Sequence, residues 1–139
     1  MSDIASCPFC NLNERILKEN MSAVCFLSNP RKVNGHFLVT PKRHIEKPWK
    51  LTKKELTDIF ELIFFIQKKL TEEYASGCDV KQNCRPFLKQ SRIKVDHVHY
   101  HIYPREYKDE LYERVEKYET DLFKDLTNKE RKEMAKLIK

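Results

Sequence analysis

The sequence predicts an α+β domain, with an antiparallel sheet of about five strands packed against one main helix and a helical C-terminal tail. Three observations carry this prediction. Two short apolar segments are joined through a turn signal, one long segment has helical periodicity, and β-branched and aromatic residues cluster near position 100. The chain of 139 residues is long enough for one domain with a core and too short for two ordinary ones.

The first two expected strands are residues 23–27 and 36–40. Both are short apolar runs that contain β-branched or aromatic residues, as strands do. Pro30 ends the first run because proline cannot donate to a sheet ladder, and Asn34-Gly35 is a strong turn signal. The two segments are therefore expected to form a hairpin-like pair with an open loop.

Residues 52–74 are expected to form the main helix. Thr52 and Glu55 have the spacing of a capping box, and Gly77 is the expected C-terminal stop. Apolar residues recur at steps of three and four, and further ones widen the stripe beyond what one sheet face requires. We therefore expect this helix to be covered by the sheet and also by either a partner, as in a homodimer, or the C-terminal tail. The residues that widen the stripe are Leu62, Phe64, Phe65 and Ile66.

Residues 80–84 are a candidate third strand, and residues 93–105 are the most distinctive segment of the chain. The latter reads I-K-V-D-H-V-H-Y-H-I-Y-P-R and predicts a strand. Because alternate side chains of a strand share a face, His97, His99 and His101 are expected to lie together. Desolvating three imidazoles without a function would be costly, so this face is the first candidate site.

The composition changes after Arg105 to charged helix formers. Residues 109–117 are expected to be helical, and Thr127 with Glu130 repeats the capping-box pattern before a last helix. We therefore divide the chain into a main domain, residues 1–105, which holds the candidate site, and a charged helical extension, residues 106–139, packed on it.

Composition narrows the class of protein. Hydrophobic residues make up 40% of the chain and charged residues 35%, and no apolar run approaches the ~20 residues that span a bilayer. The N-terminus lacks the basic start and apolar core of a signal peptide, so a cytoplasmic protein without a membrane partner is expected. The net charge of +6 suits a nucleotide ligand, but the basic residues are interleaved with acidic ones. A nucleic acid polymer is therefore not an expected partner.

The cysteines suggest a metal site. The chain has five cysteines, and Cys7 and Cys10 form a C-x-x-C pair, which in a reducing compartment is more typical of a metal clip or a redox pair than of a disulfide. Tetrahedral structural zinc needs two further ligands. Spacing leaves these open among His36, His44, His97, His101, Cys25, Cys78 and Cys84.

The run H-V-H-Y-H-I-Y-P-R closely resembles the signature of the histidine triad (HIT) family of nucleotide hydrolases and nucleotidyltransferases. The upstream segment G-H-F-L-V-T-P-K-R-H resembles a second family motif. This resemblance implies a HIT-like fold, which often forms homodimers, and a structural zinc ion. The implied zinc ligands are Cys7, Cys10, His44 and His97.

The resemblance also implies a catalytic mechanism. His99 would attack the α-phosphorus of a nucleotide and form a nucleotidyl-histidine. His101 would bond a phosphate oxygen or assist the leaving group, and the carbonyl of His97 would orient His99. The implied reaction is hydrolysis of a phosphoanhydride or phosphoramidate, with dinucleoside polyphosphates such as diadenosine tetraphosphate as the leading substrates.

The chain departs from the family just before the triad. Most members carry Gly-Gln-[Ser/Thr] there, whereas this chain has Ile93 and Lys94 at the last two positions and a longer loop. Asn83 is a candidate for the usual Asn or Gln that spans the scissile linkage, and Gln90 or Ser91 is a candidate to replace the lost polar groups. No glycine-rich phosphate loop exists, so side chains must neutralise the phosphates. The candidate cations are Arg85, Lys89, Arg92 and Lys94.

The resemblance further implies that a polar residue at the end of the first strand holds the ribose, which favours Asn29; Asn29 is as well suited to starting a turn. Phe9, Phe26 and Leu38 are candidates for the base pocket. His36 matches a family histidine and is expected to be structural.

Two alternative functions remain open. One is a nucleotidyltransferase, although the galactose-1-phosphate uridylyltransferase branch has longer chains with two histidines in the motif. The other is a zinc-stapled nucleotide-binding regulatory module with weak catalysis, which the lost Gln-[Ser/Thr] stretch favours.

Overall fold

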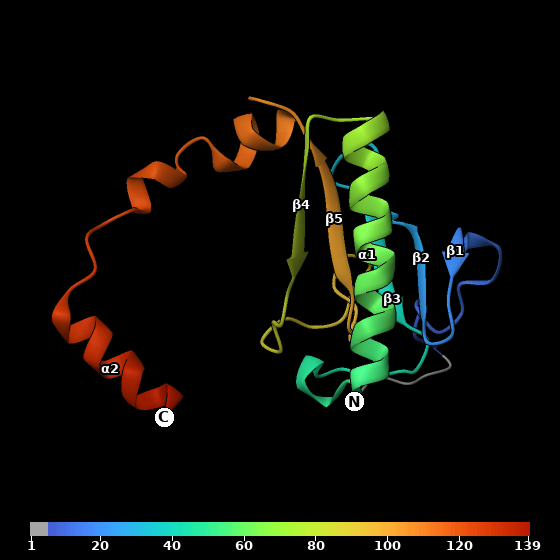
Figure 1. Cartoon of the computed structure of the whole chain (residues 1–139), viewed down its shortest axis with the longest axis horizontal. Helices are drawn as coiled ribbons and strands as arrows, with labels where there is room; N and C mark the ends of the chain where they lie inside the picture. The colour runs from blue at the N-terminus through green and yellow to red at the C-terminus, as the bar shows by residue number, and fades with distance from the viewer. Residues whose placement is uncertain (1–5) are drawn as a thin grey trace.

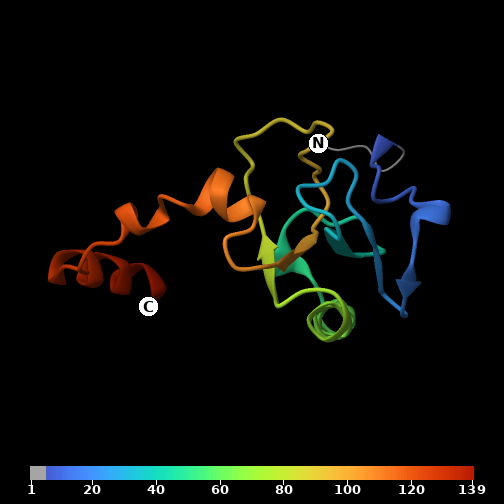
Figure 2. The same ribbon diagram turned by 90° about the horizontal axis from the view of Figure 1, so that it is seen from above.

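A computed structural model describes residues 6–139 and contains one five-stranded antiparallel sheet with the strand order β1-β2-β3-β5-β4. The main helix α1 covers one face of this sheet (Figures 1 and 2). The predicted fold class is therefore confirmed. The elements are β1 Lys18–Glu19, β2 Ala23–Leu27, β3 Phe37–Pro41, α1 Lys53–Glu73, β4 Gly77–Gln82, β5 Tyr100–Arg105 and α2 Asn128–Ile138.

The expected first pair of strands is present as β2 and β3. They pair antiparallel, with Ala23 opposite Pro41 and Leu27 opposite Phe37. Strand β5 lies between β3 and β4, which places the end of the chain's most distinctive segment inside the sheet. The two-residue edge strand β1 was missed because so short a segment has no alternation to detect.

The capping box of α1 is confirmed. The Thr52 hydroxyl accepts the Glu55 backbone N–H at 3.1 Å, and the Glu55 carboxylate accepts the Thr52 N–H at 2.9 Å. Arg43 from the loop after β3 pairs with the same carboxylate at 2.8 Å, which ties this loop to the helix start. The expected stop at Gly77 was wrong, because α1 ends at Glu73 and Gly77 begins β4.

The sheet is flanked by two apolar cores, and α1 covers the face of one of them. On the α1 face, Ile59 and Ile63 pack with Val39 and Ile102, and all four are fully buried. Burial of each such side chain contributes about 1.5–3 kcal/mol. The second core packs the N-terminal segment against β2 and β3 through Cys7, Phe9, Leu12, Val24, Phe26 and Leu38.

The prediction that one strand carries all three histidines was wrong. Strand β5 begins at Tyr100, so it includes only His101. The preceding segment is held elsewhere, because the Val98 N–H donates to the carbonyl of Ile45 at 2.7 Å. The expected shared face is present for His99 and His101, whose ring centroids lie 4.9 Å apart, whereas the Nδ1 of His97 faces the thiols of Cys7 and Cys10.

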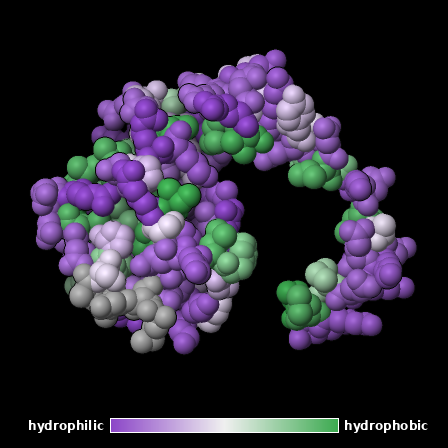
Figure 3. All heavy atoms as spheres, turned by 180° about the vertical axis from the view of Figure 1, so that it is seen from behind, coloured by the Kyte–Doolittle hydropathy of each residue, from purple (hydrophilic) through white to green (hydrophobic). Residues whose placement is uncertain are grey.

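The C-terminal extension is attached only at its start. Arg105 pairs with Asp109 at 2.8 Å, Glu116 at 2.6 Å and Asp79 of β4 at 2.5 Å. Beyond this point the chain leads away from the domain, and α2 has no buried residue (Figures 1 and 3). The expected packing of residues 106–139 on the domain is therefore not seen for α2 in this structure, and it stays a prediction for this helix.

No helix within residues 6–139 has the combined length and apolar character that crossing a bilayer requires.

Candidate functional site

Two cysteines and two histidines converge between the N-terminal segment, the loop after β3 and the approach to β5. One ligand atom from each of Cys7, Cys10, His44 and His97 lies within 4.8 Å of the others. The Cys7 Sγ is 3.5 Å from the His97 Nδ1, and the Cys10 Sγ is 3.3 Å from the His44 Nδ1. Tetrahedral zinc, with Zn–S bonds of about 2.3 Å and Zn–N bonds of about 2.0–2.1 Å, separates such atoms by about 3.5 Å. The cluster therefore has the geometry of a metal site.

The hydrogen bonds of the two imidazoles support the same assignment. The His97 Nε2 lies 2.8 Å from the carbonyl oxygen of Pro41, and the His44 Nε2 lies 3.2 Å from the Glu46 carboxylate. Because these oxygens only accept, each Nε2 must carry the proton. Both Nδ1 lone pairs then face the thiols, as metal-binding histidines require.

The ionisation of the cluster also fits a metal. Burial lowers the pKa of His97 to about 4, so the imidazole is neutral near pH 7. Burial, followed by the neighbouring Cys7, raises the pKa of Cys10 to about 11. A bound metal cation would stabilise the deprotonated forms of Cys7 and Cys10, and its binding would release the two thiol protons.

His99 lies next to this cluster, beside the aromatic ring of Phe9 at 5.1 Å. Its Nδ1 lies 2.7 Å from the carbonyl oxygen of His97 and therefore carries a proton, which leaves a lone pair on Nε2. Burial lowers the pKa of His99, so this lone pair is available near neutral pH. The ring is thus fixed in the form that a nitrogen nucleophile needs.

His101 is fixed in the opposite form by a chain of hydrogen bonds. The backbone N–H of Lys32 donates to the His36 Nδ1 at 3.1 Å, so the His36 Nε2 carries the proton. That Nε2 lies 2.9 Å from the His101 Nδ1, which must accept. The His101 Nε2 therefore carries a proton, and burial, first among several causes, lowers the pKa of His101 to about 3. The triad thus pairs a lone-pair nitrogen on His99 with an N–H donor on His101.

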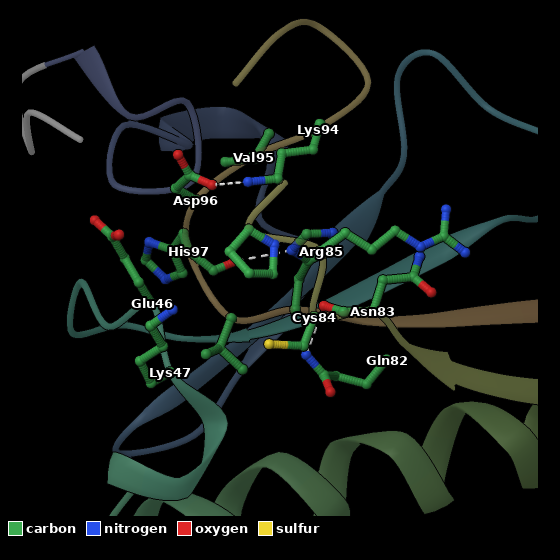
Figure 4. A pocket seen from close by; sticks show the side chains of 13 residues that line it. Glu46, Lys47, Gln82, Asn83, Cys84, Arg85, Lys94, Val95, Asp96 and His97 are labelled. Atoms are coloured by element: carbon green, nitrogen blue, oxygen red, sulfur yellow. Dashed lines mark hydrogen bonds and ion pairs between the residues drawn. The ribbon is translucent and has the colours of Figure 1, made fainter. Parts of the chain in front are cut away.

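A pocket opens beside His99 (Figure 4). Residues at and after the end of β4 line one side, and the loop after β3 with His97 lines the other. Lys94 and Asp96 form an ion pair at its rim. The lining residues are Glu46, Lys47, Gln82, Asn83, Cys84, Arg85, Pro86, Lys94, Val95, Asp96, His97, Val98 and His99.

The structure places some of the expected substrate-binding residues at this pocket and others elsewhere. Asn83 and Lys94 line it, as does Arg85. Gln90 and Ser91 instead hold the loop before the triad, because the Gln90 side chain accepts the Asp96 N–H at 2.9 Å and the Ser91 hydroxyl accepts the Ile93 N–H at 3.2 Å.

Asn29 lies after β2 and accepts from Arg92 at 3.5 Å, outside the lining of this pocket. Of the base-pocket candidates, Phe9 contacts His99, and Phe26 lies behind Phe9 with ring centroids 5.2 Å apart. Leu38 is buried in the same core.

Sequence reasoning missed two lysines near the triad. Lys81 lies opposite His101 in the β4–β5 pairing, and Lys32 lies over the ring of Tyr103 at 5.5 Å. Only the register of the sheet could have indicated Lys81. For Lys32 the sequence held one signal, the predicted turn between the first two strands, because this turn brings the loop after β2 back to His36.

The HIT domain family model matches residues 11–108, and the chain therefore belongs to the HIT domain family. A curated relative, bis(5'-adenosyl)-triphosphatase of Dictyostelium discoideum, is 35% identical over 88 residues. The match covers 60% of this chain and only 58% of that relative.

Solved structures show the same fold. A HIT family member from Bacillus subtilis superposes with a TM-score of 0.72 at 26% identity, over 96% of this chain and 94% of that one. A zinc-bound histidine triad protein from Mycobacterium smegmatis superposes with a TM-score of 0.65 at 23% identity, over 78% and 81% of the two chains.

Proposed function

We propose that the protein is a nucleotide hydrolase that cleaves dinucleoside polyphosphates, such as diadenosine tetraphosphate, at the α-phosphate through a nucleotidyl-histidine. The observation that carries the proposal is the opposite protonation of His99 and His101, which offers a nucleophile and a donor side by side. Family membership and the named activity of the Dictyostelium relative support the substrate class.

In the first step, the His99 Nε2 attacks the α-phosphorus, a nitrogen–phosphorus bond forms and the bond to the leaving phosphate breaks. The carbonyl of His97 accepts the His99 Nδ1–H throughout and stabilises the positive charge that develops on the ring. The His101 Nε2–H donates to a phosphate oxygen, where negative charge concentrates. Water then attacks the same phosphorus and releases the nucleoside monophosphate and a free His99.

The apolar end of the site suits the base. Phe9 packs against His99 with nearly perpendicular rings, and Phe26 supports Phe9 from the second core. The phosphates must then extend in the other direction, toward His101. We propose Asn29 as the ribose contact, because its polar side chain follows the end of β2 and lies within reach of Arg92 in the loop before the triad.

We propose zinc for the metal cluster, because two thiols and two imidazoles form the donor set that structural zinc prefers. When bound, zinc would supply cross-linking rather than reactivity, since all four positions are taken by protein ligands. It would fix His97 and thereby the carbonyl that orients His99. Cysteine ligands of this kind suit a reducing compartment, and we propose the cytoplasm.

We also propose a homodimer formed through α1. Phe64 and Phe65 point out of the helix and are exposed, although α1 buries its opposite face on the sheet. Exposed aromatic neighbours of this kind usually mark an interface.

The test is to trap the covalent intermediate. The protein is mixed briefly with diadenosine tetraphosphate, denatured in acid-free conditions and digested, and the peptides are measured by mass spectrometry. We expect an adenylate adduct on the peptide that holds His99. Turnover with the adduct on another residue would refute the assignment, and nucleotide binding without turnover or adduct would favour the regulatory module instead.

A further inference from the structure

Two lysines, Lys32 and Lys81, lie at Tyr103 and His101, on the side of the triad away from the metal cluster. A third basic residue, Arg85, lines the pocket beside His99 and is near enough for its charge to lower the pKa of Lys32. Lys32 comes from the loop after β2, Lys81 from β4, and Arg85 from the segment after β4. Lys81 is the register partner of His101, and the Lys32 ammonium lies 5.5 Å from the ring centroid of Tyr103. The Tyr103 ring stacks on His101 at 5.7 Å, so the triad surface continues directly into this group. We call Lys32, Lys81 and Arg85 the cationic cluster.

The cationic cluster has no acidic counterpart among the described residues. None of its three side chains forms an ion pair with another residue of the range 6–139. The nearby carboxylate of Asp79 is bound by Arg105 at 2.5 Å. Burial, and after it the positive charges of Lys81 and Arg85, lowers the pKa of Lys32. Like charges held together without acids indicate a site for an anion.

A second observation at the same place also indicates a missing acceptor. The hydroxyl of Tyr103 is buried and has no hydrogen-bond partner within the described part of the chain. Burial raises the pKa of Tyr103 to about 12, so the hydroxyl keeps its proton. A buried O–H without an acceptor costs free energy, and an anion in the cationic cluster would offer oxygens beside it.

The order of the site residues, from the metal cluster to Tyr103, indicates which anion the cationic cluster would bind. Along the chain the order is His97 at the metal cluster, His99, His101 and Tyr103. The apolar wall of Phe9 lies at the His99 end. The α-phosphate must lie at His99 and His101, so any phosphate beyond it reaches the cationic cluster.

From this geometry we infer that Lys32, Lys81 and Arg85 form a subsite for the distal phosphates of the leaving group, which selects polyphosphate substrates over substrates with a small leaving group. The inference rests on the proposed function, because it takes His99 as the point of attack. The subsite would also replace the usual Gln-[Ser/Thr] stretch. Three cations can neutralise the charge of several phosphates, whereas a hydroxyl can only donate a hydrogen bond to them.

The test uses the zinc-loaded protein and two measurements. Lys32→Met, Lys81→Met and Arg85→Met remove one charge each and keep most of the side-chain volume. Lys32→Met also keeps the backbone N–H that donates to His36. Lys132→Met on the exposed helix α2 is the matched control.

In the first measurement, calorimetry follows binding of inorganic tripolyphosphate, which needs no turnover. We expect each cluster variant to weaken binding about tenfold, the scale of one charge-assisted hydrogen bond, and Lys132→Met to leave it unchanged. The second measurement compares kcat/KM for diadenosine tetraphosphate and adenosine 5'-phosphoramidate. We expect the cluster variants to lower the ratio about tenfold, because only the first substrate has distal phosphates.

The outcomes separate the subsite from the reaction. Absence of tripolyphosphate binding in the unaltered protein, or cluster variants within twofold of Lys132→Met in binding and in the substrate ratio, would overturn the subsite. If no nucleotide is turned over but the cluster variants still lose tripolyphosphate binding, the proposed reaction fails and the anion site stands.

Discussion

The Nε2–H of His36 donates a hydrogen bond to the Nδ1 of His101 across 2.9 Å. This hydrogen bond decides which nitrogen of His101 carries the proton that can be donated to a substrate. Without it, His101 could take either tautomer. We expect His36→Leu to lower kcat about a hundredfold, the low end of the ~10²–10⁴ that a positioned proton donor contributes, with little change in KM. Steady-state kinetics on diadenosine tetraphosphate measures this.

His36→Gln is the matched variant, because its amide N–H can still donate to the His101 Nδ1. His36→Gln should therefore restore part of the kcat that His36→Leu loses. If the role of His36 were purely structural, the two variants would have equal unfolding midpoints and would lose kcat equally.

The metal cluster predicts about one zinc ion per chain, which elemental analysis of freshly purified protein measures. Cys7→Ser should lower both the zinc content and the midpoint of thermal unfolding, because bound zinc would tie the segment with Cys7 and Cys10 and the loop after β3 to the triad. Cys78→Ser is the control, since Cys78 lies in β4 outside the cluster. Full zinc content in Cys7→Ser would contradict the assignment of ligands.

The triad histidines should differ in what each substitution removes. His99→Ala should reduce turnover by several orders of magnitude while zinc and fold remain, because the covalent route is lost. His101→Ala should cost about 10²–10⁴-fold, the range for one proton donor. His97→Ala should instead lose zinc and destabilise the protein. Kinetics and elemental analysis on the same samples separate these cases, and an active, zinc-replete His99→Ala protein would end the proposed mechanism.

The exposed aromatic pair on α1 predicts self-association. Sedimentation should give twice the 16.7 kDa chain mass at micromolar concentration, because burying both rings on a second chain removes apolar area from water. Replacing Phe64 and Phe65 by serine should shift the mass to one chain. The control is Phe87→Ser, a still more exposed ring in the loop before the triad. A single-chain mass for the unaltered protein would refute the dimer.

The pairing of Arg43 with Glu55 predicts a loss of stability in acid. The Arg43 hydrogen bonds, opposed by burial and aided by Thr52, lower the pKa of Glu55 from 4.5 to about 2. Because the pKa of Glu55 is lower in the folded than in the unfolded state, its carboxylate stabilises the fold at any pH above the unfolded-state pKa. This stability is lost as the pH falls from about 5 toward 2. The contribution is on the order of 2 kcal/mol, measured as the difference in urea unfolding between the unaltered protein and Glu55→Gln. The difference should shrink toward pH 3, and a difference that stays constant with pH would contradict it.

Local patterns in the sequence determined most of the elements. Thr52 with Glu55 specified the start of α1, because a capping box depends only on residues three apart. The alternating histidines specified a shared face for His99 and His101, since extended backbone places alternate side chains together. The family motif also named the four residues of the metal cluster, which spacing alone left among many candidates.

Tertiary structure decided what depends on residues far apart in sequence. The register of β4 against β5 brings Lys81 to His101, and the return of the loop after β2 brings Lys32 to His36 and Tyr103. It also decided that α2 leaves the domain. No local pattern encodes these contacts, because each depends on how separately specified elements pack, and packing places side chains by shape and hydrogen bonding across the whole fold.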